Sequence, residues 1–131
     1  MKSFFFLLLT IILICATLSL DVLAKHFYLY WTTNWIDQSI HFLGGISVGF
    51  LFLWFFIFSG LFKSSNLNTK GARTSFLIYL SIVSILWEIY EYRIGLTHYS
   101  IPFIFDTISD LSMDLFGGIL VYLLASKIYF K

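Results

Sequence analysis

The sequence of 131 residues is poor in cysteine and in charge, and both shortages narrow the class of protein. Cys15 is the only cysteine, so the fold must hold without an intramolecular disulfide. Only 11% of the residues are charged, whereas 60% are hydrophobic and 21% are aromatic, which is too apolar for a soluble domain of this size. A formal net charge of +1 without a basic domain argues against nucleic-acid binding. The composition indicates an integral membrane protein.

Common catalytic motifs are also missing. The chain has no Walker loop, no dinucleotide-binding glycine motif, no Cys-x-x-Cys pair and no His-Glu-x-x-His sequence. Nucleotide chemistry is therefore disfavoured, and a function has to be sought in the polar residues of the hydrophobic segments.

Four segments are long and apolar enough to span a hydrocarbon core of about 30 Å, and they predict an all-α membrane bundle. They cover about residues 3–23, 40–62, 74–94 and 111–130. The first segment has two interpretations, because its basic start, its apolar run and the small residues Val22 and Ala24 are also typical of a cleaved signal peptide. We divide the chain into residues 1–24, a transmembrane helix or signal peptide, and residues 25–131, the membrane bundle.

Basic residues predict the orientation of the bundle. Lys63, Lys70 and Arg73 lie in the polar stretch 63–73 between the second and third segments. By the positive-inside rule this loop is cytoplasmic, and the C-terminus then lies on the same side. All seven acidic residues and all three histidines fall in the other, outer half of the protein.

These acidic residues and histidines divide into two groups. Asp21, His26 and His98 are expected to be solvated loop groups. The others lie within the hydrophobic segments or at their ends: Asp37, His41, Glu88, Glu91, Asp106, Asp110 and Asp114. An ionised carboxylate facing lipid costs roughly 2.5–3.5 kcal/mol near the bilayer centre, so several carboxylates on one protein must face its interior.

Two nine-residue stretches share a frame of polar residues and glycines. Residues 37–45 read DQSIHFLGG and residues 110–118 read DLSMDLFGG. In each stretch the two polar residues four positions apart share one helix face, and the glycine pair one turn below allows another helix to approach closely. The repeat predicts that the two polar pairs face each other; the alternative is coincidence in a sequence of low diversity.

An inward-facing acidic cluster needs charge compensation. The carboxylates can be held by shared protons, by pairing with Arg93, or by a bound cation, and Arg93 carries only a single charge. Carboxylate oxygens with one histidine nitrogen suit Mg²⁺, Mn²⁺ or Zn²⁺. The predicted roles are metal ligation by His41, Glu88, Asp110 and Asp114, general-base catalysis by Glu91, and a secondary position at the mouth of the site for Asp37 and Asp106.

The order and spacing of these residues resemble two families of bacterial membrane proteins. The pattern is Asp37-x-x-x-His41-Phe42, then Glu88-x-x-Glu91, then Asp110-x-x-x-Asp114-x-x-Gly117. It is similar to the VanZ-like proteins and, more closely in Trp87-Glu88 and in the final Asp-x-x-x-Asp-x-x-Gly-Gly segment, to the YjdF-like inner-membrane proteins. The resemblance covers about residues 36–125.

This resemblance implies a location in a bacterial inner membrane. Through the VanZ-like proteins it also implies an association with resistance to a glycopeptide antibiotic, and so work near cell-wall precursors or lipids. VanZ-like proteins usually have Gln in place of Glu91 and Asn in place of Asp114. The greater acidity of this chain strengthens a cation site and weakens the transfer of VanZ function.

Three functions remain open on the sequence. The first is a metal-dependent hydrolase or transferase that acts on a lipid-linked or envelope substrate among membrane lipids. The second is a component of proton- or cation-coupled transport, which with only four helices would act as a homo-oligomer. The third is a non-catalytic envelope or resistance factor with a structural acidic cluster. The segments below the glycine pairs are nearly all apolar, so the polar site is expected to open only to the outside. This one-sided access favours the first function over the second.

Overall fold

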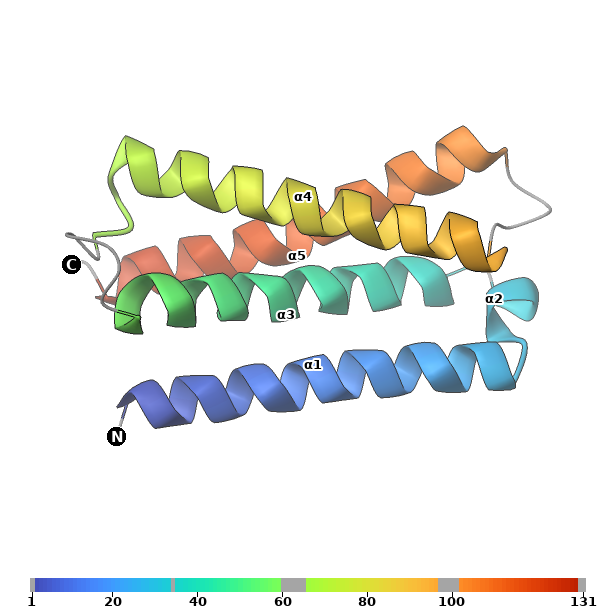
Figure 1. The fold of residues 1–131 in the computed structure, drawn as a ribbon, viewed down its shortest axis with the longest axis horizontal. Coiled ribbons are helices and arrows are strands. Elements are labelled where there is room, and N and C mark those ends of the chain that lie inside the picture. Colours follow the sequence, from blue (N-terminus) through green and yellow to red (C-terminus); the bar gives the residue numbers. More distant parts are fainter. Residues whose placement is uncertain (1, 34, 60–65, 97–101, 130–131) are drawn as a thin grey trace.

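The computed structural model describes residues 2–33, 35–59, 66–96 and 102–129, and the regular structure in these ranges is entirely helical. The helices are α1 (Lys2–His26), α2 (Leu29–Thr32), α3 (Ile36–Phe58), α4 (Lys70–Ile94) and α5 (Phe103–Tyr129). The four long helices lie lengthwise beside one another, and α2 is a single short turn at one end (Figure 1). Each long helix has the length and hydropathy needed to cross a membrane. The predicted four-span helical bundle is confirmed.

The helix boundaries differ from the predicted ones mainly at the end that carries the acidic residues. The span predicted at 40–62 begins at Ile36 and ends at Phe58, and the span predicted at 111–130 begins at Phe103. Polar residues lower the hydropathy of a segment without preventing a helix, so the helices that contain Asp37 and Asp106 begin before the apolar spans. The spans predicted at 3–23 and 74–94 likewise extend to Lys2–His26 and Lys70–Ile94.

Local signals explain where two of the helices begin. The Thr69 hydroxyl accepts a hydrogen bond from the Ala72 amide at 3.1 Å and so caps the start of α4. Pro102 directly precedes α5, where its missing N–H costs nothing and its carbonyl accepts from the first turn of the helix.

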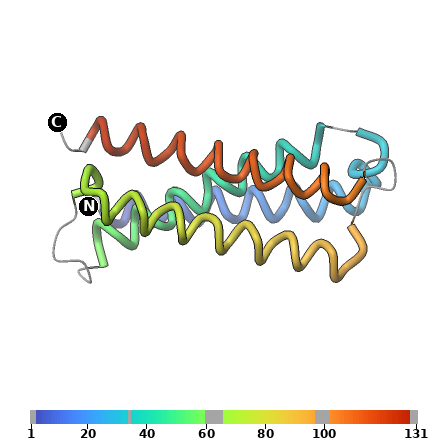
Figure 2. The backbone as a smooth tube through the Cα atoms, turned by 90° about the horizontal axis from the view of Figure 1, so that it is seen from above, coloured from blue at the N-terminus to red at the C-terminus, as the bar shows by residue number. Residues whose placement is uncertain are grey.

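The central helix of the bundle is α3. It packs against α1 and α5 and also contacts α4, whereas α1 packs against α3 and α2 and meets α4 through Lys25, which lies 5.3 Å from the centre of the Tyr90 ring. Viewed from above, α3 runs obliquely to α5 (Figure 2). The side chains of α3 therefore meet those of every other long helix.

The helices α3 and α5 approach most closely where their glycine pairs meet. A Cβ placed on Gly45 would overlap the Asp114 carbonyl and lie only 2.8 Å from its carbon. A Cβ on Gly117 would overlap the Phe42 carbonyl oxygen and lie 3.0 Å from the Ile46 nitrogen. The predicted close approach of the two repeats is confirmed, because a side chain at either glycine would push the helices apart.

The half of the bundle away from the acidic residues has an apolar core. The Phe76 and Tyr122 rings stack with centroids 4.5 Å apart, and Tyr122 donates a hydrogen bond to the Leu67 carbonyl. The buried members of this core are Phe52, Leu53, Phe56, Leu67, Ala72, Phe76, Leu80, Val121, Tyr122 and Ala125. Their burial holds α3, α4 and α5 together below the polar site.

The first helix is attached to α3 along its length. The Phe6 ring packs between the rings of Phe50 and Phe58, and the Thr17 and Ser47 hydroxyls lie 3.1 Å apart, within hydrogen-bonding distance. The choice between a transmembrane helix and a signal peptide for residues 1–24 stays a prediction.

Asp21 is not the solvated loop group that the sequence suggested. It lies within α1, is only 4% exposed, accepts a hydrogen bond of 2.7 Å from the Tyr30 hydroxyl and pairs with Lys25 at 2.7 Å. The reason is that α1 continues to His26, which turns Asp21 toward α2. His26 is exposed as expected, and His98 lies outside the described residues.

Replacing Tyr30 with phenylalanine is expected to destabilise the protein by about 1.5–3 kcal/mol, because Asp21 would lose a hydrogen bond to a charged group. Burial, together with the Asp21 carboxylate, raises the pKa of the Tyr30 phenol above its usual value of 10. The folded state therefore keeps a proton that the unfolded state releases. This contribution is fully present below pH 10 and is lost as the pH rises beyond it.

Thermal unfolding in detergent measures this difference. Tyr28→Phe is the control, since Tyr28 is 68% exposed, and it should unfold like the wild type. Equal stability of the two variants would show that the Tyr30 hydroxyl contributes nothing.

Candidate metal centre

The polar residues gather at the end of the bundle where α3 begins, and three helices contribute to the cluster. On each helix they are spaced by three or four positions, which places them on one face. They are Asp37 and His41 of α3, Glu88 and Glu91 of α4, and Asp106, Asp110 and Asp114 of α5. The structure thus brings together all seven residues that the sequence singled out, while the chemical roles assigned to them stay predictions.

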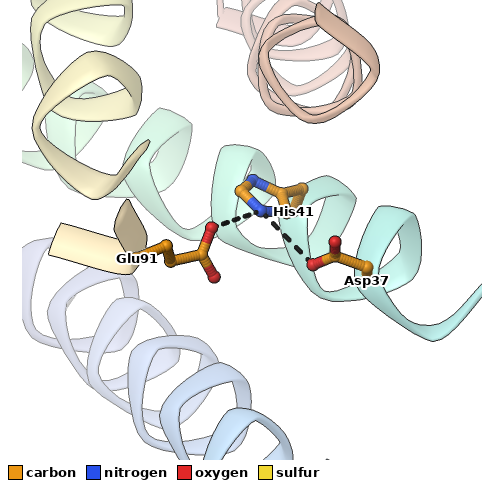
Figure 3. Close-up of side chains that lie close together, drawn as sticks. All are labelled: Asp37, His41 and Glu91. Atoms are coloured by element: carbon orange, nitrogen blue, oxygen red, sulfur yellow. Dashed lines mark ion pairs between the residues drawn. The ribbon is translucent and has the colours of Figure 1, made fainter. Parts of the chain in front are cut away.

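His41 lies at the centre of this cluster. Its Nε2 atom faces four carboxylates, with distances of 3.3 Å to Glu91, 3.6 Å to Asp37, 3.9 Å to Glu88 and 4.0 Å to Asp110. Its other nitrogen, Nδ1, is 3.3 Å from Asp114 Oδ2. Figure 3 shows the Asp37 and Glu91 side chains both directed at Nε2. The imidazole therefore separates Asp114 from the other carboxylates.

These groups are buried and poorly satisfied. The His41 side chain is 1% exposed and that of Asp110 is 3% exposed. Neither nitrogen of His41 has a hydrogen-bond partner in the described part of the chain, and the same is true of Glu88 Oε1 and Asp110 Oδ1. Because a buried polar atom without a partner costs about 1–3 kcal/mol, the cluster has several atoms ready to bind a ligand.

The cluster carries far more acidic groups than basic ones. A protonated His41 could offset only one of the five carboxylates around it. Lys25 is paired with Asp21 instead. The pairing with Arg93 considered from the sequence is not found among the described residues, where that side chain is exposed at the end of α4. Bound protons or a bound cation must supply the remaining compensation.

Three overlapping groups of three residues have the spacing of metal ligands. They are Asp37, His41 and Glu91; His41, Glu88 and Asp110; and Asp37, Asp106 and Asp110. Within each group one ligand atom per residue lies within 4.8 Å of the others. A small inward movement would bring such atoms to the 2.0–2.6 Å of metal coordination. A nitrogen and several carboxylate oxygens fit Mg²⁺, Mn²⁺ or Zn²⁺.

Two members of the cluster are more buried than the sequence suggested. Asp37 and Asp106 were expected at the mouth of the site, yet they are only 3% and 7% exposed, and Asp37 belongs to two of the three groups. The signal was present in the sequence, because Asp37 stands four residues before His41 in the repeat and so shares its helix face.

A protein-family model described as "Predicted membrane protein (DUF2238)" matches residues 2–130. No curated protein and no solved structure matches the chain. The match identifies a membrane protein family without singling out the VanZ-like or YjdF-like proteins, so those resemblances remain expectations.

Proposed function

The chain belongs to the DUF2238 family of predicted membrane proteins, and we propose that it is a metal-dependent hydrolase or transferase that acts on a lipid-linked or envelope substrate. The observation that carries this proposal is the placement of one buried imidazole among five carboxylates within membrane-spanning helices. Charge of one sign is costly in such a place unless a cation reverses the local balance.

The proposed cation lies on the Nε2 side of His41. All four carboxylates near that nitrogen lie within 4.0 Å of it, and two of the three ligand groups include His41. In this arrangement His41, Glu88 and Asp110 are the ligands, as the sequence suggested, and Asp37 joins them. Oxygen-rich ligation with one nitrogen favours Mg²⁺ or Mn²⁺, with Zn²⁺ as the third candidate.

Asp114 takes a different part in the proposal from the ligand role that the sequence suggested. It lies against Nδ1, and it belongs to none of the three ligand groups. A histidine that binds a metal through one nitrogen usually donates its other N–H to a carboxylate, which fixes the ring. We assign Asp114 to this positioning role.

Glu91 is the proposed general base. It is 7% exposed, and its Oε2 lies 3.3 Å from His41 Nε2, beside the proposed cation. A cation there would supply Lewis acidity, and Glu91 would accept the proton of the attacking water or hydroxyl.

Transport is less well supported. The far half of the described bundle is an apolar core of α3, α4 and α5 side chains, which offers little to a proton or ion on its way across. The proposed orientation keeps the acidic cluster on the outer side of a bacterial inner membrane. A site reached from one side is suited to an enzyme or a binding protein.

Metal analysis of the purified protein tests the cation. We expect about one divalent cation per chain in the wild type and none in the double variant His41→Ala/Asp114→Ala, which loses both the nitrogen ligand and its carboxylate. Asp21→Asn is the matched control, because Asp21 is an equally buried carboxylate outside the cluster, and it should keep the wild-type content. Equally negligible metal in all three proteins would refute the metal-dependent function.

A turnover experiment tests the role of Glu91. Wild type and Glu91→Gln are placed in vesicles of bacterial polar lipids with Mn²⁺, and the water-soluble products are identified by mass spectrometry. Glu91→Gln is expected to release product about 10²–10⁴-fold more slowly while it unfolds at the wild-type temperature, because the amide cannot accept a proton. Equal rates would remove Glu91 as the base.

A further inference from the structure

An apolar cavity of about 230 Å³ lies beside the cluster, among α1, α3, α4 and α5. Its walls include Ile14 of α1, Val48 of α3 and Val83 of α4, and its lining also includes His41 and Asp114. The hydroxyls of Thr17 and Ser47 also line it, but they donate to the Leu13 and Leu43 carbonyls of their own helices. The cavity therefore has a mainly apolar wall with ionisable side chains at one end, which suits an amphipathic ligand.

The lining of the cavity extends along α3. On α3 its lining runs from Ile40 to Val48, a length of about 12 Å at about 1.5 Å per residue. That length accommodates part of one extended hydrocarbon chain laid along the helix. Sites for whole drug-sized ligands occupy about 300–1,000 Å³, so a complete lipid with two chains would not fit.

The side of the bundle between α1 and α4 lets such a chain enter. Both helices line the cavity, yet among the described residues no Cα atoms of the two lie within 8 Å of each other. Their side chains meet where Lys25 lies over the Tyr90 ring, which is further along both helices than the residues that line the cavity. In a membrane this side faces hydrocarbon, because α1 and α4 are both membrane-spanning by length and hydropathy. Water is not expected to fill an apolar cavity of this kind, whereas a neighbouring lipid chain loses nothing by entering it.

We propose that this cavity holds one hydrocarbon chain of a membrane lipid, which enters sideways between α1 and α4 and places the lipid's polar group against His41 and Asp114. The inference rests on the proposed function and narrows it, because it makes the substrate a lipid recognised by a single chain. The lining follows α3 from Ile40 to Val48, so a chain laid along it keeps nearly the direction that it has in the bilayer. Only the polar group has to leave the membrane surface.

Photochemical labelling tests the chain site. The full-length protein is placed in phosphatidylcholine vesicles that contain a small fraction of phosphatidylcholine with a diazirine at the end of one chain, and labelled peptides are mapped by mass spectrometry. We expect label on Val48, which lines the cavity. Val83→Trp fills the cavity and should lower this label by about fivefold or more.

The control lies next to this position on the same helix. Ile82 is 53% exposed and does not line the cavity, so Ile82→Trp should leave the label on Val48 unchanged. Thr17→Leu fills the cavity from α1 and provides a second filled variant in case Val83→Trp does not fold. Label on Ile128, which is 72% exposed, reports the general lipid contact of each protein. Equal label on Val48 in the wild type and in both filled variants would overturn the proposal.

The same samples separate this inference from the proposed function. Labelling is repeated after removal of metal with a chelator, because the apolar walls need no cation. Labelling of Val48 in a protein that binds no metal would support the lipid site and contradict the metal-dependent function. Metal binding with no specific label on Val48 would support the metal centre and contradict the lipid site.

Discussion

Added Mn²⁺ is expected to raise the unfolding temperature of the metal-free protein in detergent. A ligand that binds only the folded state stabilises it by mass action, by about 2.7 kcal/mol when the free ligand is a hundred times the Kd. The gain should shrink as the pH is lowered, because carboxylate and imidazole ligands must lose their protons to bind a metal. Thermal unfolding over a series of Mn²⁺ concentrations, at neutral and at mildly acid pH, measures both effects.

Three variants assign the roles within the cluster. Asp110→Asn removes a proposed ligand and should abolish the response to Mn²⁺, whereas Asp114→Asn should keep the response and need about 10–100-fold more metal. Asp21→Asn, which changes a buried carboxylate outside the cluster, should respond like the wild type. Identical behaviour of the Asp110 and Asp114 variants would contradict the positioning role, and the absence of any shift in the wild type would contradict the cation.

Gly45→Ala is expected to reduce stability by about 1–3 kcal/mol, because the new methyl group would overlap the backbone of Asp114. The overlap involves main-chain atoms, which cannot turn aside as a flexible side chain can. Relief requires α5 to move away from α3, and that movement carries the proposed ligand Asp110, together with Asp114, away from His41. The variant should therefore lose the response to Mn²⁺ along with stability, and both are read from the same unfolding curves.

The neighbouring glycine provides the control for this substitution. A Cβ on Gly44 would meet its nearest atom, Asp114 Oδ1, at 3.5 Å, which is an ordinary contact. Gly44→Ala should therefore be neutral, or stabilising by up to about 1 kcal/mol through its better helix propensity. Gly117→Ala, on the opposite side of the crossing, should behave like Gly45→Ala. Equal stability of Gly44→Ala and Gly45→Ala would show that the contact between α3 and α5 accommodates an added methyl group at little cost in stability.

Much of the fold and the membership of the cluster could be predicted from the sequence. Long apolar segments predict spans because the membrane allows few alternatives, and the spacing of Asp37 and His41 predicts a shared face because the helical period is fixed. The cost of carboxylates in lipid then makes the faces of α3, α4 and α5 turn toward one another. These arguments depend only on local geometry and on the solvent.

Other features depend on tertiary geometry that no local pattern encodes. The division of carboxylates between the two nitrogens of His41 follows from how far α5 is rotated relative to α3, and the sequence places Asp110 and Asp114 alike. The burial of Asp21 depends on Tyr30, a residue of a four-residue helix with no periodicity to reveal it. The cavity exists because α1 and α4 do not pack closely against each other, and a gap between helices leaves no trace in the sequence of either helix.

The contact between the glycine pairs of α3 and α5 also bears on how the protein is made. The helix α5 follows the other three long helices along the chain, and it brings both the second glycine pair and three of the carboxylates. During synthesis α3 is therefore made before α5, so His41 and the glycines of α3 at first lack the carboxylates and glycines that α5 provides. Insertion of α5 after the other described helices closes the packing and completes the charge cluster in one step, so the proposed cation site is complete only once α5 is in place.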